Sequence, residues 1–254
     1  MTARSLPTAA TFPNRSGSGG PAVVLLPGAG LVGPDFLNIQ AGAAEFTTSV
    51  LYDRAGTGWS EPATLPRTPT EVTVELRDLL LLLDPGHEDI LAYMSEEVAG
   101  VSGQLKPDPE QLPDHLTEEQ VRGARKQWAQ LYAHWPTSVR ERLIEHNLAS
   151  WRTSVMESLN FETEVYEELR GGGALPDVPL MVLTAGGTNP YWAQMMPERL
   201  LREAHDGLRA LHAAMTAVVP RGEHREIAGA SHQYLHIEHP DAVLDALRKL
   251  HAKA

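Results

Sequence analysis

Residues 51–60 read LYDRAGTGWS and form the most specific motif of the sequence. A β-type run at 48–52 leads into it, and the glycine-rich sequence after Asp53 is typical of a turn at the end of a strand. A second, almost entirely apolar run at 22–26 stops at Pro27 and Gly28. Short apolar runs that end this sharply suit buried strands of a parallel sheet, so we expect two such strands near the start of the chain.

The rest of the chain continues this alternation of strand and helix. Residues 79–83 are five leucines followed by Asp84 and Pro85, residues 180–184 form another apolar run, and a short last strand is expected at 225–228. Two helices are predicted after these runs, from Pro197 with an apolar stripe and from Pro240 with inward-facing residues: Leu201, Ala204, Leu208, Leu211, Met215 and Val218 in the first, and Val243, Leu244, Leu247 and Leu250 in the second. The alternation predicts an α/β fold with a mostly parallel, doubly wound sheet.

Residues 90–170 differ from both ends of the chain. They are rich in helix formers and lack alternating apolar runs, so we predict a helical cap whose aromatic residues line an apolar space over the carboxyl edge of the sheet. We assign residues 21–89 and 171–254 to the α/β core, and 1–20, which is rich in Ser, Thr, Pro and Gly, to a flexible lead-in. This organisation describes one domain overall.

Composition narrows the possible partners. The net charge of −12 disfavours nucleic acid and anionic membrane surfaces, because both carry negative charge. The sequence has no cysteine, which excludes a disulfide framework, a thiolate metal site and a cysteine nucleophile. No apolar run approaches the length of a membrane span, and the lead-in lacks the apolar core of a signal peptide, so we expect a cytoplasmic protein. Nothing in the sequence indicates the oligomeric state.

Three segments together resemble the α/β-hydrolase family. Residues 25–30, LLPGAG, resemble the family's oxyanion loop, and 51–60 are similar to its D-x-x-G-x-G-x-S turn. Residues 229–232, GASH, followed by 238–240, EHP, resemble its catalytic-histidine loop. The resemblance implies an α/β-hydrolase type of sheet with the helical cap as a lid. It also implies hydrolysis of an ester or amide bond through an acyl-enzyme, with a small, apolar to moderately polar substrate under the cap.

The sequence departs from that family at the nucleophile. No G-x-S-x-G elbow occurs, and the nearest approaches, at Ser102 and Ser18, do not follow a strand. A helix predicted from residue 71 runs directly into the leucines at 79–83, which leaves no room for the strand and turn that should carry the nucleophile. We therefore predict that the nucleophile strand is missing and that 79–83 pairs with 22–26 in its place. Hydrolysis should then be impaired. The alternative is a non-catalytic pseudo-enzyme, or a protein that binds a small molecule or a partner.

The remaining site residues are predicted from the resemblance and from their positions after strands. His232 is the expected general base. Asp84 follows an apolar run and is either the acid that orients His232 or a residue that forms the turn before Pro85. Asn189 stands at the family's commonest acid position but cannot neutralise an imidazolium. The backbone N–H groups of Gly28, Ala29 and Gly30 are the expected oxyanion donors, although tight turns also need glycine.

Metal and nucleotide sites are not expected. Residues 87–89, HED, lack the spacing of a zinc motif, and we interpret His232, His236 and His239 as solvated or capping histidines. The glycine loops match neither a phosphate-binding loop nor a dinucleotide fingerprint, so no cofactor is predicted.

Overall fold

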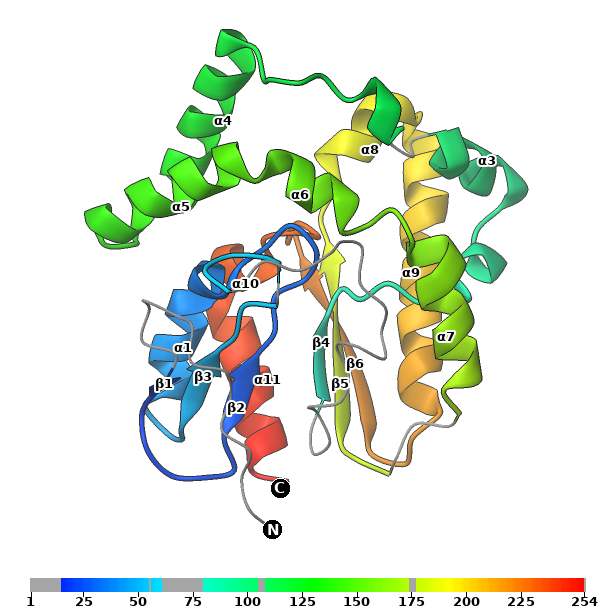
Figure 1. The fold of residues 1–254 in the computed structure, drawn as a ribbon. Coiled ribbons are helices and arrows are strands. Elements are labelled where there is room, and N and C mark those ends of the chain that lie inside the picture. Colours follow the sequence, from blue (N-terminus) through cyan, green and yellow to red (C-terminus); the bar gives the residue numbers. More distant parts are fainter. Residues whose placement is uncertain (1–14, 55, 61–79, 105–107, 174–176, 254) are drawn as a thin grey trace. The chain divides into compact units, whose positions relative to one another are not determined.

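The protein folds into two compact units, each built from two separate segments of the chain. The first unit comprises residues 1–67 and 111–158, and the second comprises 68–110 and 159–254 (Figure 1). A computed structural model describes residues 15–54, 56–60, 80–104, 108–173 and 177–253. The described strands form two three-stranded sheets, one in each unit.

The sheet of the first unit has the order β1-β3-β2. It consists of β1 (Arg15–Ser16), β2 (Val23–Leu25) and β3 (Ser49–Leu51). β2 runs parallel to β3, as the two apolar runs predict, whereas the two-residue β1 is antiparallel to β3. The helix α1 (Leu37–Ala43) packs on β3 and buries Ile39 against it, which gives this sheet a covered face.

The helices of the first unit pack around a short 3-10 turn, η1 (Gly33–Phe36), that follows the loop after β2. The remaining helices are α4 (Glu118–Leu131), α5 (Thr137–Ala149) and α6 (Trp151–Met156). The 3-10 turn η3 (Pro109–Gln111) precedes them, at the boundary where the chain passes from the second unit to the first. α4 starts at a capping box in which the hydroxyl of Thr117 accepts from the N–H of Gln120 and the side chain of Gln120 accepts in return. Tyr132, directly after α4, is fully buried and fixes this hairpin of helices to η1.

The sheet of the second unit is entirely parallel, with the order β4-β5-β6. Its strands are β4 (Leu80–Leu83), β5 (Leu180–Gly186) and β6 (Gly222–Ala228). The central strand β5 is buried along almost its whole length, which explains why its sequence is continuously apolar.

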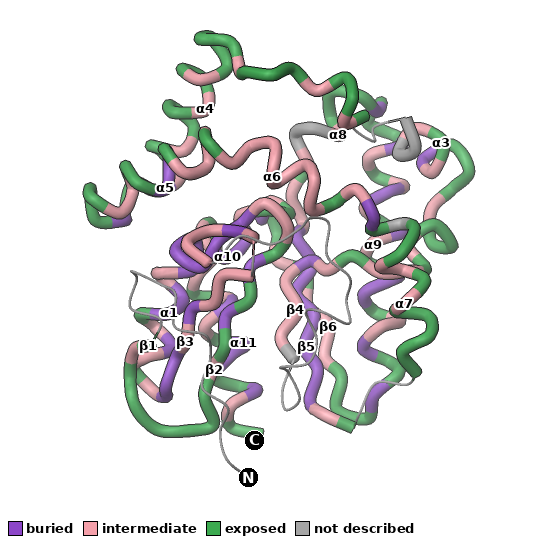
Figure 2. The backbone as a smooth tube through the Cα atoms, in the orientation of Figure 1, coloured by how far each residue is buried: buried purple, intermediate pink, exposed green. Residues whose placement is uncertain are grey.

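Helices cover both sides of this second sheet. Figure 1 shows α9 (Glu198–Ala217) on one side and α11 (Pro240–His251) on the other, so the doubly wound arrangement is confirmed for this unit. Figure 2 shows buried residues concentrated along β5 and on the inner faces of these helices. Both helices begin where a proline predicts a start, at Pro197 as the N-cap and at Pro240 as the first residue.

The predicted stripe of α9 is partly wrong. Val218 follows the last helical residue and is 68% exposed, whereas Leu200 and Gly207 are buried in its place. Gly207 is required because a Cβ atom there would lie 2.2 Å from the carbonyl oxygen of Tyr93. The buried face of α9 therefore includes Gly207, at the position where the backbone of Tyr93 comes very close to the helix.

The prediction that residues 90–166 are mainly helical is confirmed for the part of that range that the structure describes. Besides η3, α4, α5 and α6 it contains η2 (Ile90–Tyr93), α3 (Glu96–Gln104), the π-helical turn η4 (Phe161–Val165) and the start of α7 (Tyr166–Gly171). These helices are divided between the two units, with α4, α5 and α6 in the first. The second unit also holds α8 (Pro190–Met195) and α10 (Leu235–Glu238). Within the described residues, no helix is long and apolar enough to cross a membrane.

The leucine run forms a strand, as predicted. β4 pairs with β5, from Leu80 opposite Leu180 to the N–H of Asp84 on the carbonyl oxygen of Leu183, and it is an edge strand of the described sheet. The expected pairing of 79–83 with 22–26 would join the two units, so it stays a prediction. The helix predicted over 71–79 lies outside the described residues.

Candidate functional site

Asp84 and His232 form a hydrogen-bonded pair at the carboxyl edge of the second sheet. Asp84 directly follows β4, and His232 lies in the loop after β6. The Nδ1 atom of His232 is 2.7 Å from Oδ2 of Asp84. Because the strands are parallel, their carboxyl ends lie along one edge, and the two side chains meet there. The prediction that His232 lies on a loop at this edge is confirmed.

The carboxylate of Asp84 is held by the backbone as well as by the histidine. Its Oδ1 accepts a hydrogen bond of 3.0 Å from the N–H of Ala185, and the residue is buried with a left-handed φ of +48°. A carboxylate that accepts at Oδ2 requires His232 to carry its proton on Nδ1, which leaves Nε2 as the proton acceptor. The His232 side chain is 59% exposed, so that acceptor is accessible from outside the pair.

Asn189 has a different task from the one that its position in the sequence allowed. Its side-chain oxygen accepts a 3.2 Å hydrogen bond from the N–H of Trp192 at the start of α8. The sequence left Asp84 open between a triad acid and a turn former. It is hydrogen-bonded to the imidazole of His232 and also occupies the turn before Pro85, and its role as a catalytic acid stays a prediction.

A chain of buried polar groups supports the turn after Asp84. His212 on α9 is fully buried and donates from Nε2 to the carbonyl oxygen of Pro85, over 3.0 Å. Thr184 Oγ1 is 2.7 Å from Nδ1 of His212 and 2.7 Å from Nε2 of His224. Burial lowers the pKa of both imidazoles, which are therefore neutral at pH 7. Thr184 then donates to Nδ1 of His212 and accepts from Nε2 of His224, so its hydroxyl uses both its proton and a lone pair.

The loop after β2 presents a backbone N–H to a negatively charged oxygen. Leu31 donates its N–H to the carbonyl oxygen of Gly28 over 3.1 Å, which closes the turn, and Gly30 adopts a φ of +77°. The N–H of Gly30 then donates to Oε2 of Glu157 over 2.8 Å. The oxyanion loop predicted at Gly28–Gly30 thus contains an outward-facing donor, and in this structure a carboxylate of the same unit occupies it.

Arg54 holds that carboxylate from its other side. Its guanidinium donates to Oε1 of Glu157 from Nη2 at 2.6 Å and from Nε at 3.2 Å, and it also donates to the carbonyl oxygen of Pro27. The side chains are only 13% and 8% exposed for Arg54 and Glu157, respectively. A backbone N–H and a guanidinium therefore converge on one largely buried carboxylate, which is a typical geometry for recognising a carboxylate. Nothing in the spacing of the sequence indicated that Glu157 would be the occupant.

The side chain of Asp53 stabilises the turn at 51–60 by accepting backbone hydrogen bonds. Its Oδ1 accepts from the N–H of Gly33 at 2.5 Å, and its Oδ2 accepts from the N–H of Trp59 at 3.0 Å. Gly58 has a φ of +56°, and a Cβ atom there would lie 2.4 Å from Cγ of Asp53. The position of the Asp53 carboxylate therefore requires glycine at position 58, and its bond to Gly33 connects the turn to η1.

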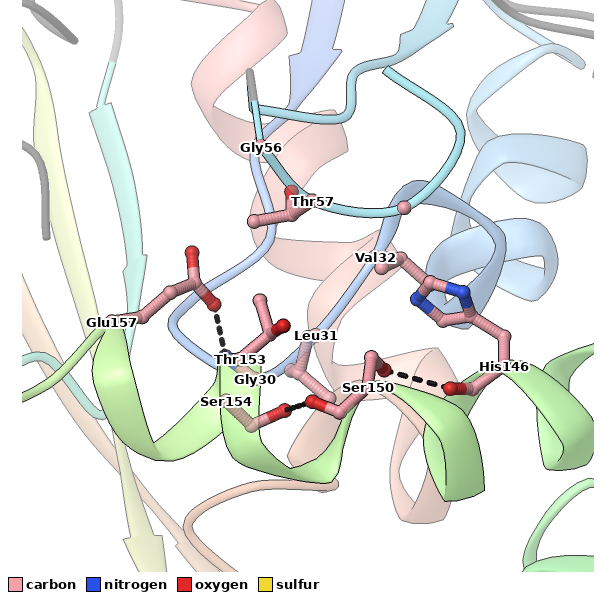
Figure 3. Close-up of a pocket in the computed structure, with 11 residues that line it drawn as sticks. Gly30, Leu31, Val32, Gly56, Thr57, His146, Ser150, Thr153, Ser154 and Glu157 are labelled. Atoms are coloured by element: carbon pink, nitrogen blue, oxygen red, sulfur yellow. Dashed lines mark hydrogen bonds between the residues drawn. The ribbon is translucent and has the colours of Figure 1, made fainter. Parts of the chain in front are cut away.

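A pocket of about 150 Å³ opens beside this turn in the first unit (Figure 3). It is bounded by the loop after β2, by the glycine turn and by α5, α6 and the residue that follows α6. Its lining residues are Gly30, Leu31, Val32, Gly56, Thr57, Gly58, His146, Ser150, Thr153, Ser154 and Glu157. The ring of His146 stacks on Trp59 with centroids 5.0 Å apart, and burial lowers the pKa of this histidine.

Comparison with known proteins adds the fold. No family model and no curated protein sequence matches the chain. Among solved structures, a laboratory-evolved variant of potato epoxide hydrolase has a TM-score of 0.59 and 12% identity, with 94% of this chain and 95% of that chain covered. The epoxide hydrolase CorEH has a TM-score of 0.54 and 14% identity, with 94% of this chain and 93% of that chain covered. A hydrolase from Pseudomonas aeruginosa has a TM-score of 0.53 and 16% identity, with 93% of this chain and 92% of that chain covered.

The chain has the α/β-hydrolase fold. In this fold the predicted residues lie in both units. Asp84 and His232 belong to the second unit and Gly28–Gly30 to the first, so their mutual proximity stays a prediction. Sequence reasoning missed Glu157 and His212, although a histidine among the apolar residues of a helix is a recognisable signal of a buried polar contact.

No serine is hydrogen-bonded to the imidazole of His232 among the residues that the structure describes. Ser231 is adjacent in sequence, and its buried Oγ has no hydrogen-bond partner within that described part. Ser102 falls within α3, but its side chain lies outside the described part. The described residues also contain no group of three or more His, Asp or Glu side chains arranged to hold a metal ion. The nucleophile is thus not identified.

Proposed function

We propose that this chain is an α/β-hydrolase-fold protein of esterase or amidase ancestry, with Asp84 and His232 as its acid–base pair and only slight hydrolysis of its own. The observation that carries the proposal is the 2.7 Å hydrogen bond between Nδ1 of His232 and the buried carboxylate of Asp84. Structural pairing alone does not require the side chain of the histidine to stay largely exposed, as that of His232 does.

The chemistry of such a pair is proton transfer at an acyl carbon. Nε2 of His232 would take the proton of the attacking hydroxyl and return it to the leaving group, while Asp84 stabilises the imidazolium between the two steps. With a serine as nucleophile, the serine oxygen bonds to the acyl carbon and the leaving group departs. Water then hydrolyses the resulting acyl-enzyme. Backbone N–H groups of Gly28–Gly30 would stabilise the oxyanion.

Two features support slight rather than efficient turnover. The sequence lacks the G-x-S-x-G elbow, and no serine in the described residues is hydrogen-bonded to His232. In serine hydrolases without a working triad, the remaining binding and oxyanion contacts give about 10³–10⁴-fold acceleration over water, far below full activity. We expect a residual rate of this kind, on a small substrate, in the cytoplasm. The net charge of −12 argues against a nucleic-acid substrate.

One observation favours the alternative of a non-catalytic protein that binds a small molecule. The N–H of Gly30, which an oxyanion would need, already donates to Glu157, and Arg54 holds that carboxylate in place. A substrate would have to displace this internal ligand before Gly30 could stabilise charge on its carbonyl oxygen.

An assay with p-nitrophenyl acetate, together with labelling by a fluorophosphonate probe, tests the proposal. We expect slow hydrolysis that falls at least tenfold in His232→Ala and in Asp84→Asn, and that is unchanged in Gln233→Ala on the same loop. No serine should be labelled. Stoichiometric labelling of a serine would show a working nucleophile and would overturn the expectation that hydrolysis is only slight. Equal rates in all four proteins would instead favour the binding protein.

A further inference from the structure

We propose that the pocket of the first unit binds a small neutral molecule rich in hydrogen-bond donors, of which a short polyol is the simplest example. The pocket is lined by residues of the loop after β2, of the glycine turn and of the helical segment 146–157 (Figure 3). Its binding chemistry can be read from the hydrogen bonds that its own groups already make. The inference concerns binding only, so it does not depend on any hydrolysis by Asp84 and His232.

The positions that would attract an anion are already occupied. The N–H of Gly30 and the guanidinium of Arg54 both donate to Glu157, whose carboxylate forms part of the pocket lining. A ligand carboxylate or phosphate would meet this carboxylate, and among the described residues that line the pocket there is no lysine or arginine. Because Arg54 pairs with Glu157, the charge of this carboxylate is largely balanced and attracts a cationic ligand only weakly.

Three of the four hydroxyl groups of the lining donate to backbone carbonyl oxygens and keep lone pairs as acceptors. Thr57 donates to the carbonyl oxygen of Arg54 at 2.9 Å, and Ser150 donates to that of His146 at 2.7 Å. Ser154 points its proton at the carbonyl oxygen of Ser150, over a long 3.4 Å. A hydroxyl whose proton is used in this way keeps lone pairs for a second partner. The lining therefore favours a ligand that brings O–H or N–H groups.

His146 adds an uncharged imidazole to the lining of the pocket. It stacks on Trp59, and burial lowers its pKa, so it carries no charge at pH 7. A neutral imidazole can donate one hydrogen bond and accept one, which suits a hydroxyl group as partner. The apolar side chains of Leu31 and Val32, both buried, provide contact for a short carbon chain.

The size of the pocket limits the ligand. An engineered protein cavity of about 150 Å³ binds benzene, so the present volume of about 150 Å³ corresponds to roughly six non-hydrogen atoms. Glycerol has this size and carries three hydroxyl groups. Butyrate and 1-pentanol match it in size, but butyrate replaces the donors by a negative charge, and 1-pentanol keeps only one hydroxyl group on an apolar chain.

Titration of the full chain with these three probes, followed by backbone amide NMR of Gly30, Thr57 and Ser154, tests the proposal. We expect saturable shifts with glycerol and an affinity at least tenfold higher than for butyrate or 1-pentanol. Equal or tighter binding of butyrate would show an anion site, and tighter binding of 1-pentanol would show an apolar one. Either result, or the absence of saturation with all three probes, overturns the proposal.

Variants locate the binding. The double change Ser150→Ala and Ser154→Ala should weaken glycerol binding at least tenfold, because two acceptors are removed. Ser158→Ala is the matched control, since Ser158 makes the same kind of bond to the carbonyl oxygen of Val155 but is exposed and does not line the pocket. Thr57→Val, nearly equal in shape, tests the same idea outside the helices if the double variant does not fold. Unchanged affinity in the folded variants would place the ligand elsewhere and contradict the proposal.

Discussion

Thr184 is hydrogen-bonded to two imidazoles, of which His212 is fully buried and His224 is half-buried. Its hydroxyl lies 2.7 Å from a ring nitrogen of each. Replacing Thr184 by Val keeps the shape but leaves one nitrogen of each ring without a partner. We expect a loss of about 1–3 kcal/mol of unfolding free energy from the buried nitrogen of His212, and less from the half-buried His224, measured by urea denaturation. Thr163→Val, at an exposed position, should change stability by less than about 0.5 kcal/mol.

The same imidazoles predict how stability depends on pH. Because burial lowers their pKa in the folded state, the unfolded chain binds more protons below its histidine pKa of about 6.5. The contribution of His212 and His224 is therefore constant above that pH and is lost as pH falls through their lowered folded values. Denaturation of the wild type and of His212→Asn at several pH values from 5 to 8 isolates the His212 contribution. A stability difference between the two proteins that does not change with pH would contradict this assignment.

Asp35 should act in the opposite direction. It is fully buried, and burial raises its pKa to about 6, although hydrogen bonds from Tyr132 and from the N–H of Val32 oppose this rise. The folded state thus holds a proton that the unfolded state releases near pH 4. Stability from this group is fully present below pH 4 and falls by about 3 kcal/mol as pH rises to 6 and above. The difference in unfolding free energy between wild type and Asp35→Asn should follow this curve, and a flat difference would refute it.

At the scale of the element, the glycine turn after β3 offers a paired test. Ala at position 58 would combine a left-handed backbone with a Cβ atom 2.4 Å from the Asp53 carboxyl carbon, so we expect a loss of about 1–3 kcal/mol. Ala at position 123, in the exposed middle of α4, meets no atom within 4 Å and should stabilise the protein by about 0.5–1 kcal/mol. Thermal denaturation of the two variants should give shifts of opposite sign. Shifts in the same direction would show that the turn does not depend on Gly58.

The elements also show which parts of the fold can be predicted from sequence. β5 was predictable because a strand buried on both faces needs a continuous apolar run, and 180–184 is one. β4 was predictable as a strand from its leucines, but its neighbour was not, since the run is equally apolar toward any partner. The stripe of α9 shifted because Gly207 carries no apolar signal, although only glycine fits against Tyr93 there.

The candidate site follows the same logic. Asp84 and His232 were predictable because each directly follows a strand, and parallel strands bring such residues to one edge. Glu157 and Ser154 were not, because a residue on a helix far along the chain gains its role only from tertiary packing. The contact of Glu157 with Gly30 spans 127 positions in sequence, and no local pattern encodes it.

At the scale of the whole molecule, the charge is strongly unbalanced. A net charge of −12 repels itself within the folded protein, and the exposed ion pairs, such as Arg125 with Glu145, offset little of this. At 1 M NaCl the screening length falls to about 3 Å, so we expect the melting temperature to rise relative to 10 mM NaCl. Differential scanning calorimetry at the two salt concentrations, with sucrose as an uncharged control, measures the effect. A lower melting temperature at high salt would mean that attractive ion pairs outweigh the repulsion.

The interleaving of the two units has a consequence for the chain during its synthesis. Residues 68–110 belong to the second unit but leave the ribosome before 111–158, which complete the first. β4 precedes its partner β5 by about a hundred residues, which at 5–20 residues per second means a wait of roughly 5–20 s. Throughout that interval an apolar strand of leucines has no hydrogen-bond partner of its own, and such a strand readily pairs with another chain. Slower translation of the intervening helices should therefore increase aggregation of the nascent protein rather than help it to fold.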